Sequence, residues 1–492
     1  MFKEVGKPMK SKTSSYIVEF ELITTFQDRY VINKKMKVAK SIYNACLNEC
    51  LKRLKAVKAD KEYHTLVKTE SSKQRNIRLK EIELYYGYSE YSIHSYVKDI
   101  NMHFKNHLGS FEVQKLATRA FKAVEKYHYG KAKKVYFKTY KDDMSVENKS
   151  NKTGLRLKDF KIIWDSLSMS FKVKKNDKYA QLALLDRTKY VRVLKREIRG
   201  KERFFVQLIQ EGLPPKKHQT STVENRVGID IGTSTIAVVS DNKVFMNELA
   251  TIKTPYKKLR RLDRAMDRSR RSTNPQNYND NGTVKKGFKE WNYSKRYLKL
   301  KYRRKELFRK IASIRKQNHE QTANFILSLG LDVRVETMRF QSLQKRTKKT
   351  TRNKKNGKIN KKKRFGKSIA NYAPAMLLEI INRKLKYQDL ELKKIDTYAV
   401  KASQFNHTTG EWTKKFLSNR WNNIDDKLIQ RDLYSAFLIQ NTTKTLDVVD
   451  IDLCNLKFDN FVKLHDIEIQ RLKNLNNKKW LCHNKWLIFD EK

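Results

Sequence analysis

The chain has 492 residues and carries 109 Lys and Arg against 52 Asp and Glu, a formal net charge of +57. So large an excess opposes compaction unless a polyanion neutralises it, which favours a nucleic-acid partner. A secretory or membrane protein is disfavoured, because MFKEVGKPMKSK at the N-terminus contains no apolar core segment and no apolar run reaches the ~18–20 residues of a membrane span. We therefore expect a cytoplasmic, nucleoid-associated protein of two to four domains, with no signal peptide or transmembrane segment.

The first part of the chain predicts one strand followed by helices. Residues 15–25 alternate apolar and acidic side chains, which is the period-2 pattern of a half-buried strand. Residues 33–54 repeat their apolar positions at helical spacing, with Cys46 and Cys50 one turn apart. We expect these cysteines to be small core residues, with a metal site or a disulfide as the alternative. The helical pattern continues from Lys61 to Lys131.

Short apolar and aromatic segments follow, separated by Asn, Lys and Gly turns. They are KKVYFKTY (133–140), FKIIWDSLSMSFKV (160–173), AQLALL (180–185), YVRVLKREI (190–198) and ERFFVQLIQE (202–211). We expect them to form strands of a small β-barrel or sheet, completed by the N-terminal strand across the helical insertion. This assigns 1–32 and 133–212 to a split barrel, 33–132 to a helical insertion and the polar stretch 213–226 to a linker.

Three acidic residues of the second half stand in informative contexts. Asp230 lies in VGIDIGTSTIAVV and Glu336 in LDVRVETMRFQSLQKR, where β-branched runs predict buried strands, whereas Asp432 in LIQRDLYSAFLI opens a predicted helix. A carboxylate at the end of a core strand is costly to bury unpaired, so a cation should satisfy it. Three carboxylates from separate elements suit a pair of Mg²⁺ ions that hydrolyse phosphodiesters. We therefore predict catalytic and metal-binding roles for all three.

Strongly basic segments separate these acids. Residues 256–272 and 291–328 predict helices, the second ending at Gly330. Between Lys345 and Lys367, thirteen of 23 residues are basic and none is acidic. We expect this loop to contact nucleic-acid backbone near the site, with a nuclear-import signal as the alternative. The candidate backbone contacts are Lys361, Lys362, Lys363 and Arg364, together with Arg431, for which a plain surface charge is the alternative.

With these motifs in order, the second half resembles a RuvC-type, RNase H-like nuclease domain, and in particular the TnpB family of transposon-associated RNA-guided nucleases, relatives of type V CRISPR effectors. The three acidic motifs are similar to that family's three catalytic motifs, with Asp230, Glu336 and Asp432 at the catalytic positions. VYFKTY resembles a segment of the family's wedge domain, a split β-barrel around a helical recognition insertion. The resemblance implies an α/β multidomain fold, two Mg²⁺ ions, a guide RNA and a double-stranded DNA target.

The resemblance also divides the second half. It implies a nuclease domain over 227–400 and 427–445, a zinc-ribbon insertion over 401–426 and an unassigned extension over 446–492. The family's two C-x-x-C pairs align with Asn406, Thr409, Asn422 and Asp425. None of these is a thiolate, so we expect no structural zinc, and packing of Trp412, Phe416 and Trp421 to hold the loop instead.

The extension is rich in acidic residues, namely Asp447, Asp450 and Asp452. We expect it to form a solvated strand edge, with a mimic of a metal site as the alternative.

Three other functions compete with an RNA-guided DNA endonuclease of a mobile element. An actin-like or sugar-kinase-type ATPase would use the VGIDIGTST turn to hold phosphates, but only 15 glycines occur and no later Gly-rich loop follows. A nuclease-inactive guided DNA-binding regulator predicts loss of one carboxylate, and all three are intact. A DDE transposase predicts the order Asp, Asp, Glu. We expect a monomeric nuclease; its transposon or CRISPR context, its guide and its flanking DNA motif stay open.

Overall fold

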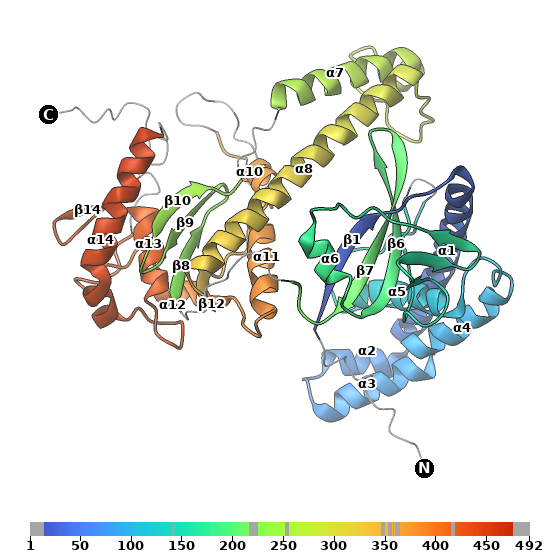
Figure 1. The fold of residues 1–492 in the computed structure, drawn as a ribbon, viewed down its shortest axis with the longest axis horizontal. Helices are drawn as coiled ribbons and strands as arrows, with labels where there is room; N and C mark the ends of the chain where they lie inside the picture. The colour runs from blue at the N-terminus through green and yellow to red at the C-terminus, as the bar shows by residue number, and fades with distance from the viewer. Residues whose placement is uncertain are drawn as a thin grey trace. The chain divides into compact units, whose positions relative to one another are not determined.

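The structure is a computed structural model that describes residues 14–139, 142–215, 225–250, 255–345, 350–352, 357, 359, 365–414 and 419–475. The chain divides into two compact units, Met1–Lys217 and His218–Lys492 (Figure 1). Among the helices described, none has the length and apolarity that a membrane span needs.

Five helices make up much of the first unit: α1 (Phe26–Ala59), α2 (Lys61–Lys68), α3 (Lys73–Tyr85), α4 (Glu90–Met102) and α5 (Ser110–His128). Thr25 starts α1 with a capping box, in which its hydroxyl accepts from the Asp28 amide and the Asp28 carboxylate accepts from the Thr25 amide. Cys46 and Cys50 are fully buried on α1 and both are free thiols. The prediction that they are small core residues is confirmed.

The strands of the first unit form a four-stranded sheet in the order β1-β7-β6-β2 and a three-stranded sheet in the order β3-β4-β5. Their bounds are β1 (Ser15–Glu21), β2 (Val146–Glu147), β3 (Arg156–Lys158), β4 (Lys161–Trp164), β5 (Leu167–Met169), β6 (Thr188–Ile198) and β7 (Lys201–Glu211). β1 pairs antiparallel with β7 from Ser15↔Glu211 to Glu21↔Phe205, so the N-terminal strand does complete the sheet. The expected barrel does not form among the described strands, because β1 and β2 stay at opposite edges of their sheet.

Two predicted strands of this unit are wrong. Residues 180–185 lie in and just after the helix α6 (Lys178–Ala183), which Asp177 caps by accepting from the Ala180 amide, and Ala, Gln and Leu favour a helix once it is capped. Residues 133–139 belong to no strand. Instead, Asn44 of α1 donates to the Lys138 carbonyl and accepts from the Lys138 amide, which satisfies the backbone without a ladder.

A five-stranded sheet in the order β10-β9-β8-β11-β12 forms the centre of the second unit. Its strands are β8 (Arg226–Ile231), β9 (Thr235–Val239), β10 (Val244–Glu248), β11 (Asp332–Glu336) and β12 (Lys393–Ile395). β8, β11 and β12 run parallel, whereas β9 and β10 are antiparallel to their neighbours. α8 (Lys295–Leu329) and α11 (Pro374–Lys386) cover one face, and α13 (Arg431–Gln440) and α14 (Ile451–Asn474) cover the other (Figure 1).

The remaining elements connect these layers. They are α7 (Tyr256–Thr273), the 3₁₀ turn η1 (Pro275–Asn277), α9 (Phe340–Leu343), α10 (Gly366–Tyr372), α12 (Thr397–Val400), β13 (Trp421–Ile424) and β14 (Lys427–Gln430). Gly330, expected as the residue that ends α8, is the helix C-cap in extended backbone. A side chain there would begin 2.2 Å from the Asn225 carbonyl oxygen, so glycine permits the close approach of the chains that enter β11 and β8.

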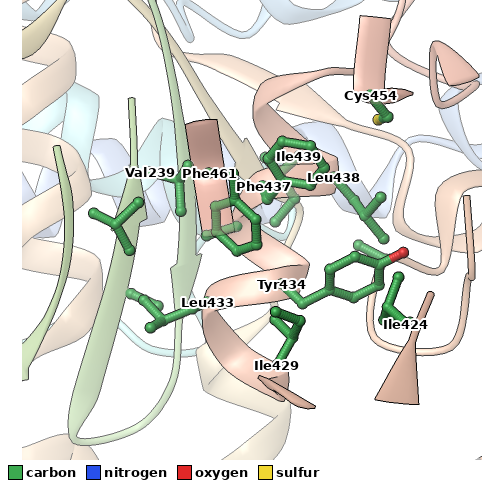
Figure 2. Packing of buried hydrophobic residues seen from close by; sticks show 14 of the residues in the cluster. Val239, Ile424, Ile429, Leu433, Tyr434, Phe437, Leu438, Ile439, Cys454 and Phe461 are labelled. Atoms are coloured by element: carbon green, nitrogen blue, oxygen red, sulfur yellow. The ribbon is translucent and has the colours of Figure 1, made fainter. Parts of the chain in front are cut away.

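The expectation of a solvated strand edge after Leu446 is wrong. The segment forms α14, and Asp450 caps it by accepting from the Leu453 amide. Cys454, Phe458 and Phe461 recur at helical spacing and are buried against α13. Phe437 of α13 stacks on Phe461 with ring centroids 4.4 Å apart (Figure 2). The extension is therefore an integral layer of the second unit.

Candidate active site

The register of the central sheet places Asp230 and Glu336 on the same face. β8 and β11 pair Gly228 with Arg334 and Ile229 with Val335, so the next pair along this parallel register joins Asp230 to Glu336. Side chains alternate between faces along a strand, so Ile229 and Val335 point into the core beside α8 and α11. Asp230 and Glu336 therefore point toward the layer of α13, from neighbouring strands.

Gly228 brings the third acid to the same place. A Cβ atom on Gly228 would lie 2.0 Å from the Ala436 carbonyl oxygen and 2.5 Å from the Gln440 amide nitrogen, so α13 rests directly on β8. Asp230 follows Gly228 by two residues on the same face, and Asp432 precedes Ala436 by one helical turn on the same side of α13. This contact carries the first turn of α13 toward the end of β8, where Asp230 lies.

The electrostatics confirm that the acids are neighbours. Burial raises the pKa of Asp230 well above its usual range, the charges of Asp432 and Glu336 raise it further, and Arg431 opposes them. Burial also raises the pKa of Glu336. Among the described residues, neither the Asp230 nor the Glu336 carboxylate has a hydrogen bond or ion pair, although both backbones pair within the sheet. Negative charge is thus gathered at these two acids, and Arg431 offsets only part of it at Asp230, an imbalance that a bound cation would correct.

Asp432 differs from the other two acids because it is paired. Its carboxylate accepts from Arg431 at 3.0 and 3.2 Å and lies 3.5 Å from Arg420. In the described part of the chain, no three His, Cys, Asp or Glu side chains stand close enough together to hold a metal ion. The donor set nevertheless fits a hard divalent cation, since carboxylate oxygens are what Mg²⁺ prefers. Arg420 was not predicted, and only the fold brings it to Asp432.

The N-terminus of α13 is braced by α14. The Gln430 amide donates to His465 Nε2 at 3.0 Å, and the Gln430 side-chain oxygen caps α13 by accepting from the Leu433 amide at 2.8 Å. Since a backbone amide only donates, His465 Nε2 carries no proton and Nδ1 donates to Asp466 at 2.9 Å. Gln430 and His465 are both buried. These two hydrogen bonds fix Gln430, which is one residue before Arg431 and two before Asp432.

The four positions aligned with zinc ligands have other roles. Asn406 accepts from the amide and hydroxyl of Thr408, and Thr409 accepts from the Glu411 amide. Asn422 is buried on β13, and Asp425 occupies the β13–β14 turn with φ of 50°.

His407 links this region to α13. Its Nδ1 lies 2.7 Å from the Tyr434 hydroxyl, and the Tyr434 side chain belongs to the same buried cluster as Ile424 and Ile429 (Figure 2). Of the expected packing residues, Trp412 lies against Phe405 with centroids 5.0 Å apart, while Phe416 lies outside the described residues.

The basic loop after β11 is described only in part. Lys361, Lys362, Lys363 and Arg364 lie outside the described residues, so their predicted phosphate contacts stay predictions. The loop ends beside the site, because Ser368 of α10 donates to the Thr233 carbonyl in the turn after Asp230 at 3.2 Å. Arg431, the other predicted contact to nucleic-acid backbone, forms an ion pair with Asp432.

No family model and no curated protein matches the sequence. Several solved structures are similar to the chain, and two of them are compared with it below. A Cas12f1–sgRNA–target DNA complex matches with a TM-score of 0.43 and 12% identity, covering 88% of this chain and 99% of that one. A CRISPR-Cas12f ternary complex matches with a TM-score of 0.26 and 16% identity, covering 85% and 82%.

Proposed function

We propose that the chain is an RNA-guided, Mg²⁺-dependent DNA endonuclease of a mobile element, with an RNase H-like nuclease domain in its second unit. The observation that carries this proposal is the convergence of Asp230, Glu336 and Asp432 from β8, β11 and α13 on one face of one sheet. The net charge of +57 supports a nucleic-acid partner. The absence of any familiar base-reading motif supports delegation of sequence recognition to a guide RNA, with double-stranded DNA as the target.

The three carboxylates would hold the metal. Bound Mg²⁺ ions supply an activated water and stabilise the leaving oxygen. Asp230, which is half-buried and feels the charges of both other acids, is the residue whose ionised form most needs a cation. Asp432 would have to leave Arg431 and Arg420 to join it. Those two guanidiniums could then face the phosphates of the substrate, which they can bind in a bidentate manner.

The test compares single substitutions in the purified protein with its bound RNA. Asp230→Ala, Glu336→Ala and Asp432→Ala should each abolish cleavage of a guide-matched duplex in Mg²⁺ while DNA binding persists. Asp459→Ala is the matched control, since Asp459 is exposed on α14 and pairs only with Lys427 at 2.9 Å among the described residues. Three alanine variants that all cut at the control rate would refute the site.

Sequencing the RNA that co-purifies tests the guide. A transposon-end transcript supports the mobile-element proposal, and a repeat-derived RNA would replace it with a CRISPR effector. Protein that is free of discrete RNA yet fully active on a defined DNA would end the guided interpretation.

A second function has one observation in its favour. Asp432 pairs with Arg431 and Arg420, and the described residues contain no cluster of three side chains placed to hold a metal ion, as expected of a guided DNA-binding regulator that does not cut. Tight, guide-dependent DNA binding with no cleavage in Mg²⁺ or Mn²⁺ would establish this function instead.

A further inference from the structure

The turn between α7 and α8 is an ordered structure, although its residues 274–294 contain only the short η1. Asn274 is fully buried and ties the two ends together: its Nδ2 donates to the Asn292 carbonyl at 2.8 Å, and its Oδ1 accepts from the Asn292 amide at 2.7 Å. One level further out, Asn277 donates to the Glu290 carbonyl at 2.7 Å and its own carbonyl accepts from the Lys285 amide at 3.0 Å. We call residues 274–294 the hairpin tip.

Aromatic and guanidinium groups stiffen the base of the hairpin tip. Tyr278 and Trp291 meet edge to face with centroids 5.8 Å apart. The Arg270 guanidinium lies 4.9 Å from the Trp291 ring, and that of Arg271 lies 4.8 Å from the Tyr278 ring. Such contacts add to the burial of the rings and fix the orientation of the loop on α7.

Phe288 projects from this base into solvent. It is 94% exposed, the highest value among the large apolar side chains of the described chain. Its neighbours are Lys285, Lys286 and Lys289. Isolated apolar residues are common on protein surfaces, so exposure alone means little. Here, however, a fully exposed aromatic ring stands on a tied loop among three cations, at the end of a helical pair that is itself strongly basic.

We propose that Phe288 is a stacking platform for an unpaired base of the DNA strand, with Lys285, Lys286 and Lys289 neutralising the adjacent phosphates. A ring with a free face stacks on any base, and a surrounding positive charge is what distinguishes a nucleic-acid platform from a protein-docking residue. A protein partner would favour a contiguous apolar patch, whereas this ring is flanked by lysines. The choice of DNA as the occupant rests on the proposed function.

The length of α8 sets how far this platform lies from the sheet. α8 runs without a break from its N-cap Ser294 to Leu329, and Ala323 is buried against the central sheet (Figure 1). The intervening 29 residues correspond to about 44 Å along the helix axis. That distance equals roughly 13 nucleotide steps of B-form DNA. The platform should therefore contact DNA well away from the carboxylates, and a short substrate should not reach it.

The experiment measures binding of guide-matched DNA by the full protein with its RNA, in an Asp230→Ala background that prevents cleavage. Each DNA carries an unpaired flank of either 5 or 25 nucleotides. Phe288→Ala and Phe288→Leu should weaken binding of the long-flank DNA by about 5- to 100-fold, because both remove the π-face. Phe288→Trp, which keeps an aromatic face, should bind the long-flank DNA as tightly as Phe288 does. The short-flank DNA should bind all variants equally, which excludes a collapse of the hairpin.

Salt dependence separates stacking from charge. The plot of log K against log salt should keep its slope in the Phe288 variants, whereas replacing the three lysines with alanine should flatten it by up to about 2. Three results would overturn the platform: unchanged binding of long flanks by Phe288→Ala, unchanged binding of long flanks by Phe288→Leu, or equal losses of binding on both flanks. A flank made of RNA that binds better than the DNA flank would overturn the choice of DNA.

The nuclease proposal fails separately from the platform. If the wild-type protein never cuts but Phe288→Ala still weakens binding of long flanks, the platform stands and the nuclease does not. If cutting depends on Asp230 and every Phe288 variant binds normally, the reverse holds.

Discussion

Replacing Gly228 with alanine tests the contact that brings Asp432 to Asp230. The new Cβ atom would begin 2.0 Å from the Ala436 carbonyl oxygen, and ordinary contacts start near 3.4 Å. The obstructing atoms belong to the backbone of α13, so no side-chain rotation relieves the clash. The helix must move away from β8 by about 1.4 Å at this point.

The displacement predicts two separate losses. Overpacking of a tight core typically costs about 1–3 kcal/mol of unfolding free energy. A misplacement of catalytic groups by about 1 Å costs on the order of 100-fold in rate. Gly228→Ala should therefore lower the melting temperature by several degrees and reduce cleavage about 100-fold, with guide binding retained, because the guide does not contact this buried position.

The assay combines thermal melts with single-turnover cleavage of a guide-matched duplex. Gly109→Ala is the control, since Gly109 is in the first unit, has φ of −72° and meets no atom closer than 3.8 Å. It should lose at most a little stability and keep its cleavage rate. If Gly228→Ala kept the wild-type cleavage rate and melting temperature, the packing of α13 on β8 would not be what assembles the site.

Three further predictions concern buried groups around α13. Asp230→Asn should raise the melting temperature of the metal-free protein, measured in EDTA, because it removes one of the mutually repelling acids that raise the pKa of Asp230. Burial lowers the pKa of His407 to about 4, so between pH 6.5 and 4 only the unfolded chain holds this proton. The free energy of unfolding should fall through that window, by up to about 1.4 kcal/mol per pH unit. In urea titrations at a series of pH values, His407→Asn, which keeps an acceptor for Tyr434, should flatten this fall. His465→Ala should cost about 1–3 kcal/mol by leaving the Gln430 amide without its acceptor, and should slow cleavage. His465→Gln, whose side-chain oxygen can replace Nε2, should recover both in the same melts and cleavage assays.

Much of the second unit was predictable because its signals are local. The β-branched runs around Asp230 and Glu336 and the helix that opens at Asp432 appear where the patterns placed them. The close contact of Gly228 with Ala436 was not predicted, although both residues are small and lie close in sequence to Asp230 and Asp432. What the sequence could not show is which helix covers which strand. That pairing depends on contacts between residues about 200 positions apart.

The errors have equally specific causes. Residues 133–139 have strand composition, but the side chain of Asn44 on α1 takes up both backbone hydrogen bonds of Lys138 that a neighbouring strand could have made. α14 was not predicted because Asp450 and Asp452, which suit a solvated edge, occupy its N-cap and first turn, whereas its buried face begins only at Cys454. Arg420 pairs with Asp432 across twelve residues, through a hairpin whose geometry no short motif encodes.

The helix that carries Asp432 is held by protein contacts on several sides. Gly228 lies beneath its middle, Tyr434 reaches His407 at its flank, and His465 reaches the residue that caps its start. Each contact involves a different element, so losing one leaves the others to maintain the fold while the first turn of α13 loosens. Variants at the flank and at the cap should therefore reduce cleavage more than their cost in stability suggests. This follows because the carboxylate of Asp432 lies at the end of the helix that these contacts orient.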